Sequence, residues 1–393
     1  MSKRGEKALV PKKRFPEFQN AEEWEEKPFS KLFEIGSGKD YKHLGKGAIP
    51  VYGSGGYMLS VDEYLYDGES ACIGRKGTIN NPIFLTGKFW TVDTLFYTHS
   101  FKDCLPKFVF LLFQNINWLK FNEAGGVPSL SKVIINKIER CVPGIEEQQK
   151  IADCLTSIDE LIAAHSQKLL ALKAYKKGLM QQLFPAEGET EPKLRFPEFR
   201  GRGEWDAKPI SKVGKVVTGN TPSTSDKSNY GGSKMFVSPA DISDHRFVTQ
   251  TNTTLSEAGF AKTRHIPEQS ILFVCIGSTI GKVAQNMNEC ATNQQINAVI
   301  PFEKYVNAFI YYALDLNSSK IAELAGKQAV PIINKTLFST VALNVPSKKE
   351  QQKIADCLAS IDDLITAQAQ KVDTLKAHKK GLMQQLFPVM DDK

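Results

Sequence analysis

The chain has 393 residues, of which 41% are hydrophobic and 24% charged, with a formal net charge of +7 at pH 7. This length exceeds what one hydrophobic core usually supports, so two or more domains are expected, and the composition excludes an intrinsically disordered chain. The longest apolar run, 108–113, is far shorter than the ~20 residues that cross a bilayer, and the basic N-terminus lacks the apolar stretch of a secretory signal. We therefore expect a cytoplasmic protein, and its positive charge permits nucleic-acid binding without requiring it.

Cysteines and histidines are scattered along the chain, seven of the first and six of the second. No Cys-x-x-Cys pair occurs, and no histidine stands at metal-ligand spacing from a cysteine or another histidine. We expect reduced thiols and no bound metal.

The N-terminal segment contains the motif RFPEF at 14–18, which returns at 195–199. Each copy is followed by a tryptophan and a Lys-Pro pair, and the two copies are separated by an offset of 181 residues. Repetition at a fixed offset marks related structural units. We predict a constant N-terminal segment over 1–27 and a linker that carries its repeat over 186–208.

Residues 28–145 form the first insert, which reads as a mixed α/β domain with many short strands. Runs such as 49–52, 71–73 and 95–97 are rich in strand-forming residues and are bounded by glycine-rich turns. One helix is predicted over 106–119. The insert carries 13 basic and 10 acidic residues, so it contributes to the positive charge.

A long helix is predicted over 146–185, with a second copy over 350–388. The motifs EQQKIADCL and KKGLMQQLFP occur in both, at a constant offset of 203 residues. Apolar residues alternate at spacings of four and three, which is typical of a coiled-coil seam, and a proline closes each copy. The predicted seam consists of Ile151, Leu155, Ile158, Ile162, Leu169, Leu172, Leu179, Leu183, Ile354, Leu358, Ile361, Ile365, Val372, Leu375, Leu382 and Leu386.

Residues 209–349 form the second insert, with strands predicted over 270–276 and 297–300 and a helix over 306–316. It carries 14 basic and 9 acidic residues. Its sequence hardly aligns with the first insert and the distance between the repeated frames differs by 22 residues, so constant frames enclose two dissimilar inserts.

The two long helices are expected to pair as an antiparallel coiled coil, because a strict seven-residue period gives a narrower seam than a globular core face. The alternative is that each helix packs only on its own domain. A paired rod of ~35 residues would be about 50 Å long, comparable to about 15 base pairs of DNA, and would act as a ruler between the inserts. Polar residues interrupt both seams at matching places. His165 with Gln368 would form a central polar layer that fixes the register, and the alternative is that each is a solvated residue at a loosely packed position.

Loops that combine glycine with basic and polar residues suit DNA binding, because glycine allows close approach and the polar side chains contact phosphates and bases. No phosphate-binding P-loop motif occurs. For each single residue a solvated loop is the alternative reading. The candidate DNA-binding residues are Lys39, Tyr41, Lys42, His43, Lys46, Ser54, Tyr57, Arg75, Lys76 and Thr78 in the first insert, and Asn220, Thr221, Ser223, Lys227, Tyr230, Lys234, Ser278, Thr279, Lys282, Asn293 and Gln294 in the second.

Catalytic motifs are missing from the sequence. The tetrad Asn81-Pro82-Ile83-Phe84 differs at its third position from the Asn-Pro-Pro-aromatic motif of adenine methyltransferases. No S-adenosylmethionine signature, metal-dependent nuclease trio or helicase motif is present. We expect a recognition module that is not itself an enzyme and has no catalytic residues.

The layout of the whole chain resembles the specificity (S) subunits of type I restriction-modification systems. The phrases KGAIPVYGSGG at 46–56, RKG at 75–77, EQQKIA at 147–152 and GLMQQLF at 178–184 are similar to those of the family. The resemblance implies an α+β protein with two mixed α/β target recognition domains, separated by two long helices in a pseudo-twofold repeat. Each domain would read one half of a bipartite, asymmetric site in double-stranded DNA.

Partners follow from the same resemblance. Two methyltransferase (modification) subunits would dock on the constant frame, and restriction subunits would join through them. The chain itself would bind no cofactor, since S-adenosylmethionine, ATP and Mg would be bound by the partner subunits. Two alternatives stay open: a coiled-coil scaffold whose heads bind protein or carbohydrate, and a self-sufficient methyltransferase.

Overall fold

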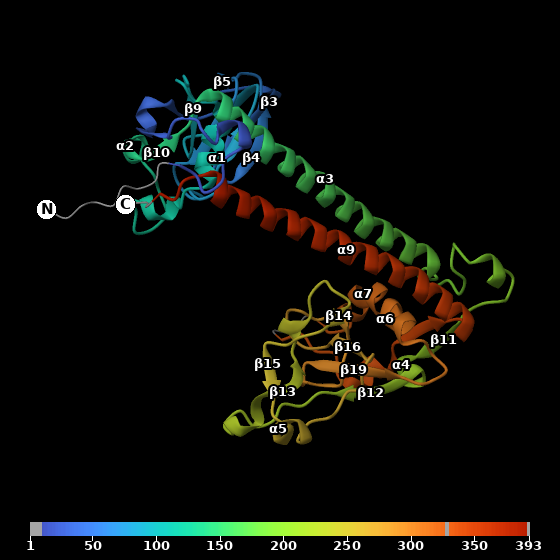
Figure 1. Ribbon diagram of the computed structural model, residues 1–393. Coiled ribbons are helices and arrows are strands. Elements are labelled where there is room, and N and C mark those ends of the chain that lie inside the picture. The colour runs from blue at the N-terminus through green and yellow to red at the C-terminus, as the bar shows by residue number, and fades with distance from the viewer. Residues whose placement is uncertain (1–9, 327–329, 391–393) are drawn as a thin grey trace. The chain divides into compact units, whose positions relative to one another are not determined.

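The computed structural model describes residues 10–326 and 330–390 (Figure 1). The chain divides into two compact units, of which unit 1 comprises Met1–Ser166 with Lys371–Lys393 and unit 2 comprises Gln167–Gln370. Each unit contains one mixed α/β domain and one half of each long helix. The predicted α+β class and internal repeat are therefore confirmed.

Unit 1 contains two four-stranded sheets, in the orders β2-β9-β6-β7 and β4-β3-β8-β5, and the two-stranded ladder β1-β10. Helix α1 packs on strands β6 and β7. The strands are β1 (Glu25–Pro28), β2 (Glu34–Ser37), β3 (Lys46–Gly53), β4 (Gly56–Val61), β5 (Tyr66–Asp67), β6 (Ser70–Gly74), β7 (Ile83–Leu85), β8 (Lys88–Thr91), β9 (Leu95–His99) and β10 (Glu139–Val142), and the short helices are α1 (Pro106–Gln114) and α2 (Lys132–Lys137).

Unit 2 contains a five-stranded sheet in the order β12-β19-β16-β17-β14, a three-stranded sheet in the order β15-β13-β18, and the ladder β11-β20. Helix α6 packs on the larger sheet (Figure 1). The strands are β11 (Asp206–Pro209), β12 (Gly214–Thr218), β13 (Tyr230–Val237), β14 (Phe247–Val248), β15 (Thr253–Leu255), β16 (Ile271–Val274), β17 (Val283–Asn286), β18 (Cys290–Thr292), β19 (Ile296–Pro301) and β20 (Ala342–Val345), and the short helices are α4 (Ile210–Val213), α5 (Glu257–Ala261), α6 (Asn307–Leu316), α7 (Ser318–Glu323) and α8 (Lys335–Thr340).

The two inserts share a topology that their sequences hide. The order β2-β9-β6-β7 corresponds to β12-β19-β16-β17, and β4-β3-β8 corresponds to β15-β13-β18. The match includes the parallel pairs β3-β8 and β13-β18 within otherwise antiparallel sheets. The inserts are therefore two versions of one fold.

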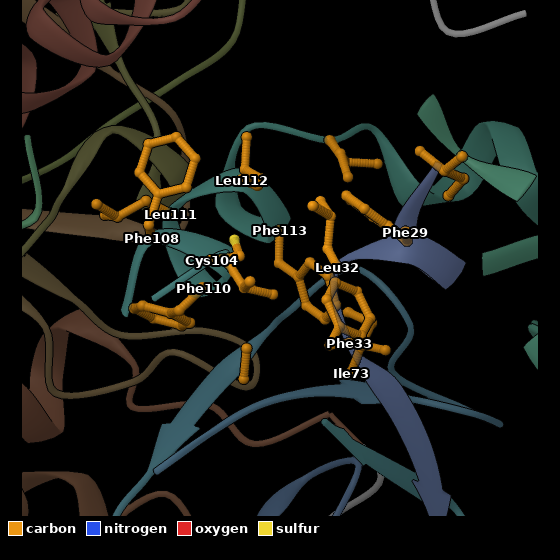
Figure 2. Close-up of a cluster of buried hydrophobic side chains, with 14 of the residues drawn as sticks. Phe29, Leu32, Phe33, Ile73, Cys104, Phe108, Phe110, Leu111, Leu112 and Phe113 are labelled. Atoms are coloured by element: carbon orange, nitrogen blue, oxygen red, sulfur yellow. The ribbon is translucent and has the colours of Figure 1, made fainter. Parts of the chain in front are cut away.

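Helix α1 forms the centre of the unit 1 core, and its side chains from Phe108 to Phe113 are all buried (Figure 2). The predicted helix over 106–119 is too long, because α1 ends at Gln114 and a separate 3-10 turn begins at Trp118. The Trp118 indole N–H donates to the Phe113 carbonyl oxygen at 2.8 Å, so a side chain beyond the helix helps to satisfy a carbonyl of its last turn.

The long helices are α3 (Ile145–Leu183) and α9 (Lys348–Leu386), each of 39 residues. Both end two residues before the prolines at 185 and 388, as the sequence predicts, because proline disfavours helical backbone in the residue before it.

Short antiparallel ladders close the base of each insert. In unit 1, β1 pairs with β10 in the register Glu25 with Val142, and in unit 2, β11 pairs with β20 in the register Asp206 with Val345. Each ladder joins the constant segment before an insert to the constant segment after it. The insert is therefore tied to its frame by backbone hydrogen bonds that do not depend on its own sequence.

None of the seven cysteines, all of which lie within the described residues, forms a disulfide, and burial raises the pKa of the Cys72 and Cys275 thiols to about 12. Within 10–326 and 330–390, no helix has the length and apolar character needed to cross a membrane. The same residues contain no cluster of three or more His, Cys, Asp or Glu side chains that could hold a metal ion.

Candidate nucleic-acid interface

Four loops of unit 1 meet at one surface. The Ser54 amide, at the tip of the β3–β4 hairpin, donates to Thr94 Oγ1 at 3.5 Å, and the Arg75 amide donates to the Thr94 carbonyl oxygen at 2.8 Å. The Lys39 amide donates to the Thr91 carbonyl oxygen at 2.8 Å, so the loop after β2 joins the same surface. The structure thus brings together the predicted residues Lys39, Tyr41, Lys42, Ser54, Tyr57, Arg75 and Lys76.

This surface holds two neighbouring depressions. One is lined by Tyr41, Lys42, the glycine-rich hairpin tip and Tyr57, and the other by Arg75 and Lys76, with Asp93 at the edge of both. Tyr57 is 62% exposed, so its ring is free to contact a base or sugar. Cations and an aromatic ring around a glycine-rich tip suit close approach to a DNA backbone.

The corresponding loops of unit 2 meet in the same way but carry amides and hydroxyls. The Thr221 hydroxyl donates to Gln294 Oε1 at 2.7 Å, and Asn293 Nδ2 donates to Gln295 Oε1 at 2.9 Å. Gln295 Nε2 in turn donates to the Ile276 carbonyl oxygen at 3.2 Å. These contacts bring together the predicted residues Thr221, Asn293 and Gln294, whereas Asn220 Nδ2 donates to the Lys262 carbonyl oxygen at 3.0 Å and Ser278 and Thr279 lie in the loop that follows Ile276. Amide side chains of this kind can both donate to and accept from base edges.

Three other predicted residues of unit 1 lie around its surface. His43 is exposed and lies edge-on to the Trp90 ring, with ring centroids 5.9 Å apart. Lys46 begins β3, at the end of the hairpin away from its tip, and Thr78 is exposed beyond the turn at Gly77.

Three predicted residues of unit 2 instead make contacts within their own domain. The Lys234 ammonium lies 3.3 Å from the Glu257 carboxylate, and Lys282 Nζ donates to the Ile242 carbonyl oxygen at 2.9 Å. The Tyr230 hydroxyl donates to the Pro222 carbonyl oxygen at 2.8 Å. Ser223 and Lys227 are exposed.

The candidates Lys227, Tyr230 and Lys234 were expected to share one loop over 227–234, but Tyr230 and Lys234 lie in a strand, because β13 begins at Tyr230. Its two glycines belong to a bulge, where the pairing with Leu255 shifts between Tyr230 and Lys234. Glycine in a strand often marks such a bulge, and from sequence alone it reads as a loop.

A repeated segment supports the equivalent loop in both units. In unit 1 the Gly77 amide donates to the Pro128 carbonyl oxygen at 2.9 Å, and in unit 2 the Gly277 amide donates to the Pro331 carbonyl oxygen at 3.0 Å. Both glycines have positive φ, of 89° and 97°, which an L side chain rarely adopts. Equivalent prolines near the end of each insert, 203 residues apart, therefore support the loops that carry the predicted DNA contacts.

Four basic residues outside the predicted set line depressions in the two units, namely Lys132 in unit 1 and Lys215, Arg264 and Lys335 in unit 2. Lys132 and Lys335 are separated by 203 residues, which is the offset of the long helices. The repeat itself was therefore a signal that could have found them.

The helical seam is the second component of the candidate site. In unit 1 the first part of α3 packs against the last part of α9, and in unit 2 the last part of α3 packs against the first part of α9. None of the sixteen predicted seam residues is exposed. This confirms the antiparallel pairing, since the start of each helix contacts the end of the other.

The two lysines that interrupt the seam each pair with an aspartate on the other helix. Lys379 Nζ lies 2.7 Å from the Asp159 carboxylate in unit 1, and Lys176 Nζ lies 2.6 Å from the Asp362 carboxylate in unit 2. From the first pair to the second, the residue number in α3 rises by 17 and the residue number in α9 falls by 17, so both pairs fit the same antiparallel register. Ion pairs at seam positions specify register.

The predicted central polar layer is divided between the units, with His165 in unit 1 and Gln368 in unit 2. His165 is half-buried and Gln368 is buried. Their contact with each other stays a prediction.

Comparison with known proteins adds to this geometry. Residues 21–174 and 202–377 match the family model of the type I restriction modification DNA specificity domain. The chain is 26% identical over 315 residues to the type I restriction enzyme HindI specificity subunit of Haemophilus influenzae, and the matched region covers 62% of this chain and 68% of that protein. It is 31% identical over 168 residues to the MjaIX specificity subunit of Methanocaldococcus jannaschii, covering 41% of this chain and 39% of that protein.

Among solved structures, the S subunit of the type I restriction-modification system from M. genitalium matches with a TM-score of 0.68. The sequence identity is 14%, and the match covers 97% of this chain and all of that one. This similarity is one of fold.

Proposed function

Because the chain belongs to the type I restriction-modification DNA specificity family, we propose that it reads a bipartite, asymmetric DNA target, one half-site with each recognition domain. The observation that carries the proposal is that the two domains share one fold but present different side chains on their loops. Unit 1 presents Lys, Arg and Tyr side chains around a glycine-rich tip. Unit 2 presents a network of Asn, Gln and Thr side chains, with Lys215, Arg264 and Lys335 in a separate depression. One scaffold with two different surfaces suits two unequal half-sites.

The two surfaces favour different contacts. The cations and exposed tyrosine of unit 1 can hold phosphates and stack on a sugar or base. The amide groups of unit 2 can form paired hydrogen bonds with an adenine edge in the major groove. In this proposal the helical pair sets the unread spacer, and its length is fixed by the seam rather than by either surface.

Catalysis and its cofactors belong to the partner subunits in this proposal. Two modification subunits would bind S-adenosylmethionine and methylate the target, and restriction subunits would bind ATP and Mg. The chain itself would supply the target choice and the docking surfaces.

A docking surface for two identical partners is supported by the exposed part of the repeat. Gln149 donates to Asp153 at 2.7 Å on α3, and Gln352 donates to Asp356 at 2.7 Å on α9. About two turns beyond each of these aspartates, Leu161 and Leu364 are 50% and 57% exposed. We define the docking faces as residues 149–161 and 352–364.

The two faces differ only at Thr156/Ala359 and Glu160/Asp363, and this similarity is not explained by the fold. Exposed side chains change with little effect on stability, and the middle of the helices has changed, since the exposed Leu170 corresponds to Asp373. A matched pair of exposed leucines is what two copies of one partner require, because like partners bind like surfaces in a pseudo-symmetric assembly.

The variant Leu161→Glu/Leu364→Glu is expected to bind no modification subunit, whereas each single variant keeps one. A buried glutamate would be left without a partner in the interface, which costs several kcal/mol. The stoichiometry of the purified complex, measured by light scattering after gel filtration, checks this. Leu170→Glu is the matched control and should bind two subunits; equal loss in the control would contradict the assignment of the docking faces.

DNA binding by the assembled complex tests the proposal as a whole. Adenine methylation is mapped in a host with and without this chain, and a duplex with the resulting target is titrated at several salt concentrations. We expect a slope of several units in log affinity against log salt, because each phosphate contact releases counterions. A slope near zero would instead support a scaffold that binds protein or carbohydrate, and methylation by the isolated chain would support a self-sufficient methyltransferase.

A further inference from the structure

Lys132 and Lys335 occupy equivalent positions in the two units. Each is the first residue of a short helix, α2 or α8, and each follows a cap residue whose side chain accepts a backbone N–H, Ser131 from Ile134 and Asn334 from Leu337. Each helix begins just after the segment that supports the Gly77 or Gly277 loop. The two lysines therefore hold the same place beside the candidate DNA surface of their unit.

Each lysine lines a depression together with a hydroxyl from the equivalent edge strand. In unit 1 that hydroxyl belongs to Ser37, the last residue of β2, and in unit 2 it belongs to Thr218, the last residue of β12. The glycine that follows each of these strands packs so closely on the neighbouring backbone that a side chain would collide with it. In both depressions, therefore, the backbone after the edge strand packs closely on the backbone of a neighbouring segment.

The rest of each depression differs between the units. In unit 1 it includes Arg75 and Lys76 with the acidic Asp93 and Glu123, and in unit 2 it includes Lys215, Arg264 and His265. The lysine and the hydroxyl are thus what the two depressions share, whereas the neighbouring side chains have diverged.

Internal pairing does not explain why both lysines are present. The repeated pairs Arg14/Arg195 and Lys176/Lys379 each contact a carboxylate of the chain. Within 10–326 and 330–390, Lys132 and Lys335 form no ion pair. Lys132 lies 5.9 Å from the centre of the Phe96 ring, a contact that leaves its charge unneutralised.

From this equivalence we propose that Lys132 and Lys335 are matched contacts to the DNA phosphate backbone, one in each half-site. The inference rests on the proposed DNA-reading function. Two domains that read different bases have in common only the sugar-phosphate backbone of their half-sites. A group retained by both domains amid diverged neighbours suits that shared feature, because phosphate contacts position the protein and carry no sequence information.

The test uses the full chain assembled with its modification subunits, a duplex with the methylation-mapped target, and a scrambled duplex of equal length. Lys132→Ala and Lys335→Ala should each lower the salt slope by about one unit, and the double variant by about two. Affinity for both duplexes should fall by the same factor, and the methylated sequence should not change. Lys132→Arg/Lys335→Arg should restore the slope, because it keeps the charge.

The control variant Lys31→Ala/Lys212→Ala removes another exposed lysine pair of the repeat and should keep the wild-type slope. An unchanged slope in the Lys132→Ala/Lys335→Ala variant, an equal loss in the control, or a changed target sequence would each overturn the inference while the wild-type complex still binds DNA. If the wild-type complex itself shows no salt-dependent binding, the proposed function fails instead.

Discussion

Exchange of residues 29–138 for the equivalent segment of a relative will abolish methylation at the original target and create a new target that shares one half-site and the spacer. The physical reason is the ladder between β1 and β10, which closes the insert with backbone hydrogen bonds. Junctions at these residues leave both strands of the ladder native. Genome-wide mapping of methylated adenines measures both half-sites and their separation in one experiment.

One packing condition applies to the donor segment. Phe108 of α1 contacts Phe387 just beyond α9 with ring centroids 5.6 Å apart, and both rings contact Trp24 of the frame. The donor must supply an aromatic residue at this place, since loss of a buried phenylalanine costs about 3 to 5 kcal/mol.

The reciprocal exchange is the control. Residues 210–341 lie between β11 and β20, which form the matching ladder of unit 2. This exchange should change the other half-site alone. A change of both half-sites in either chimera would show that the domains do not read DNA independently.

Insertion of one heptad into both long helices, after Gln167 and after Gln370, is expected to end methylation at the original spacing. Seven residues preserve the seam, because its period is seven, and lengthen the helical pair by about 10 Å, or about three base pairs of DNA. The target found by methylation mapping should keep both half-sites with a longer spacer. Affinity for it should be lower, because three base pairs also rotate the second half-site by about 0.3 of a turn.

A heptad in α3 alone is the control for this design. It shifts one half of the seam against its partner and separates the Lys–Asp pairs at 159 with 379 or at 176 with 362. Loss of the folded complex is expected rather than a longer spacer. If the double insertion methylates the original target unchanged, the helices do not measure distance.

Predictions from sequence patterns were wrong where the same type of residue occurs in two kinds of local structure. The glycines at 231 and 232 read as a loop but form a bulge in β13, and the apolar residues near 118 read as helix although α1 has ended at Gln114. In both places a contact with a distant or neighbouring segment decides the outcome. Local composition carries no information about such contacts.

By itself, the sequence determined the repeat, the two long helices and their seam. Helix period, proline termination and a constant offset are local features, and each is written in consecutive residues. The repeated motifs to which the proposed docking faces belong can likewise be read without any structure. The end of each helix was predicted to within two residues.

Only the tertiary structure showed that the two inserts are one fold and that Lys132 and Lys335 correspond. These facts depend on strand pairs far apart in the chain, such as β2 with β9 and β12 with β19. Strand pairing is set by burial of side chains on both faces of a sheet, and many sequences satisfy the same burial pattern. Two inserts can therefore lose all visible similarity in sequence while the hydrogen-bonded framework that positions their loops stays the same.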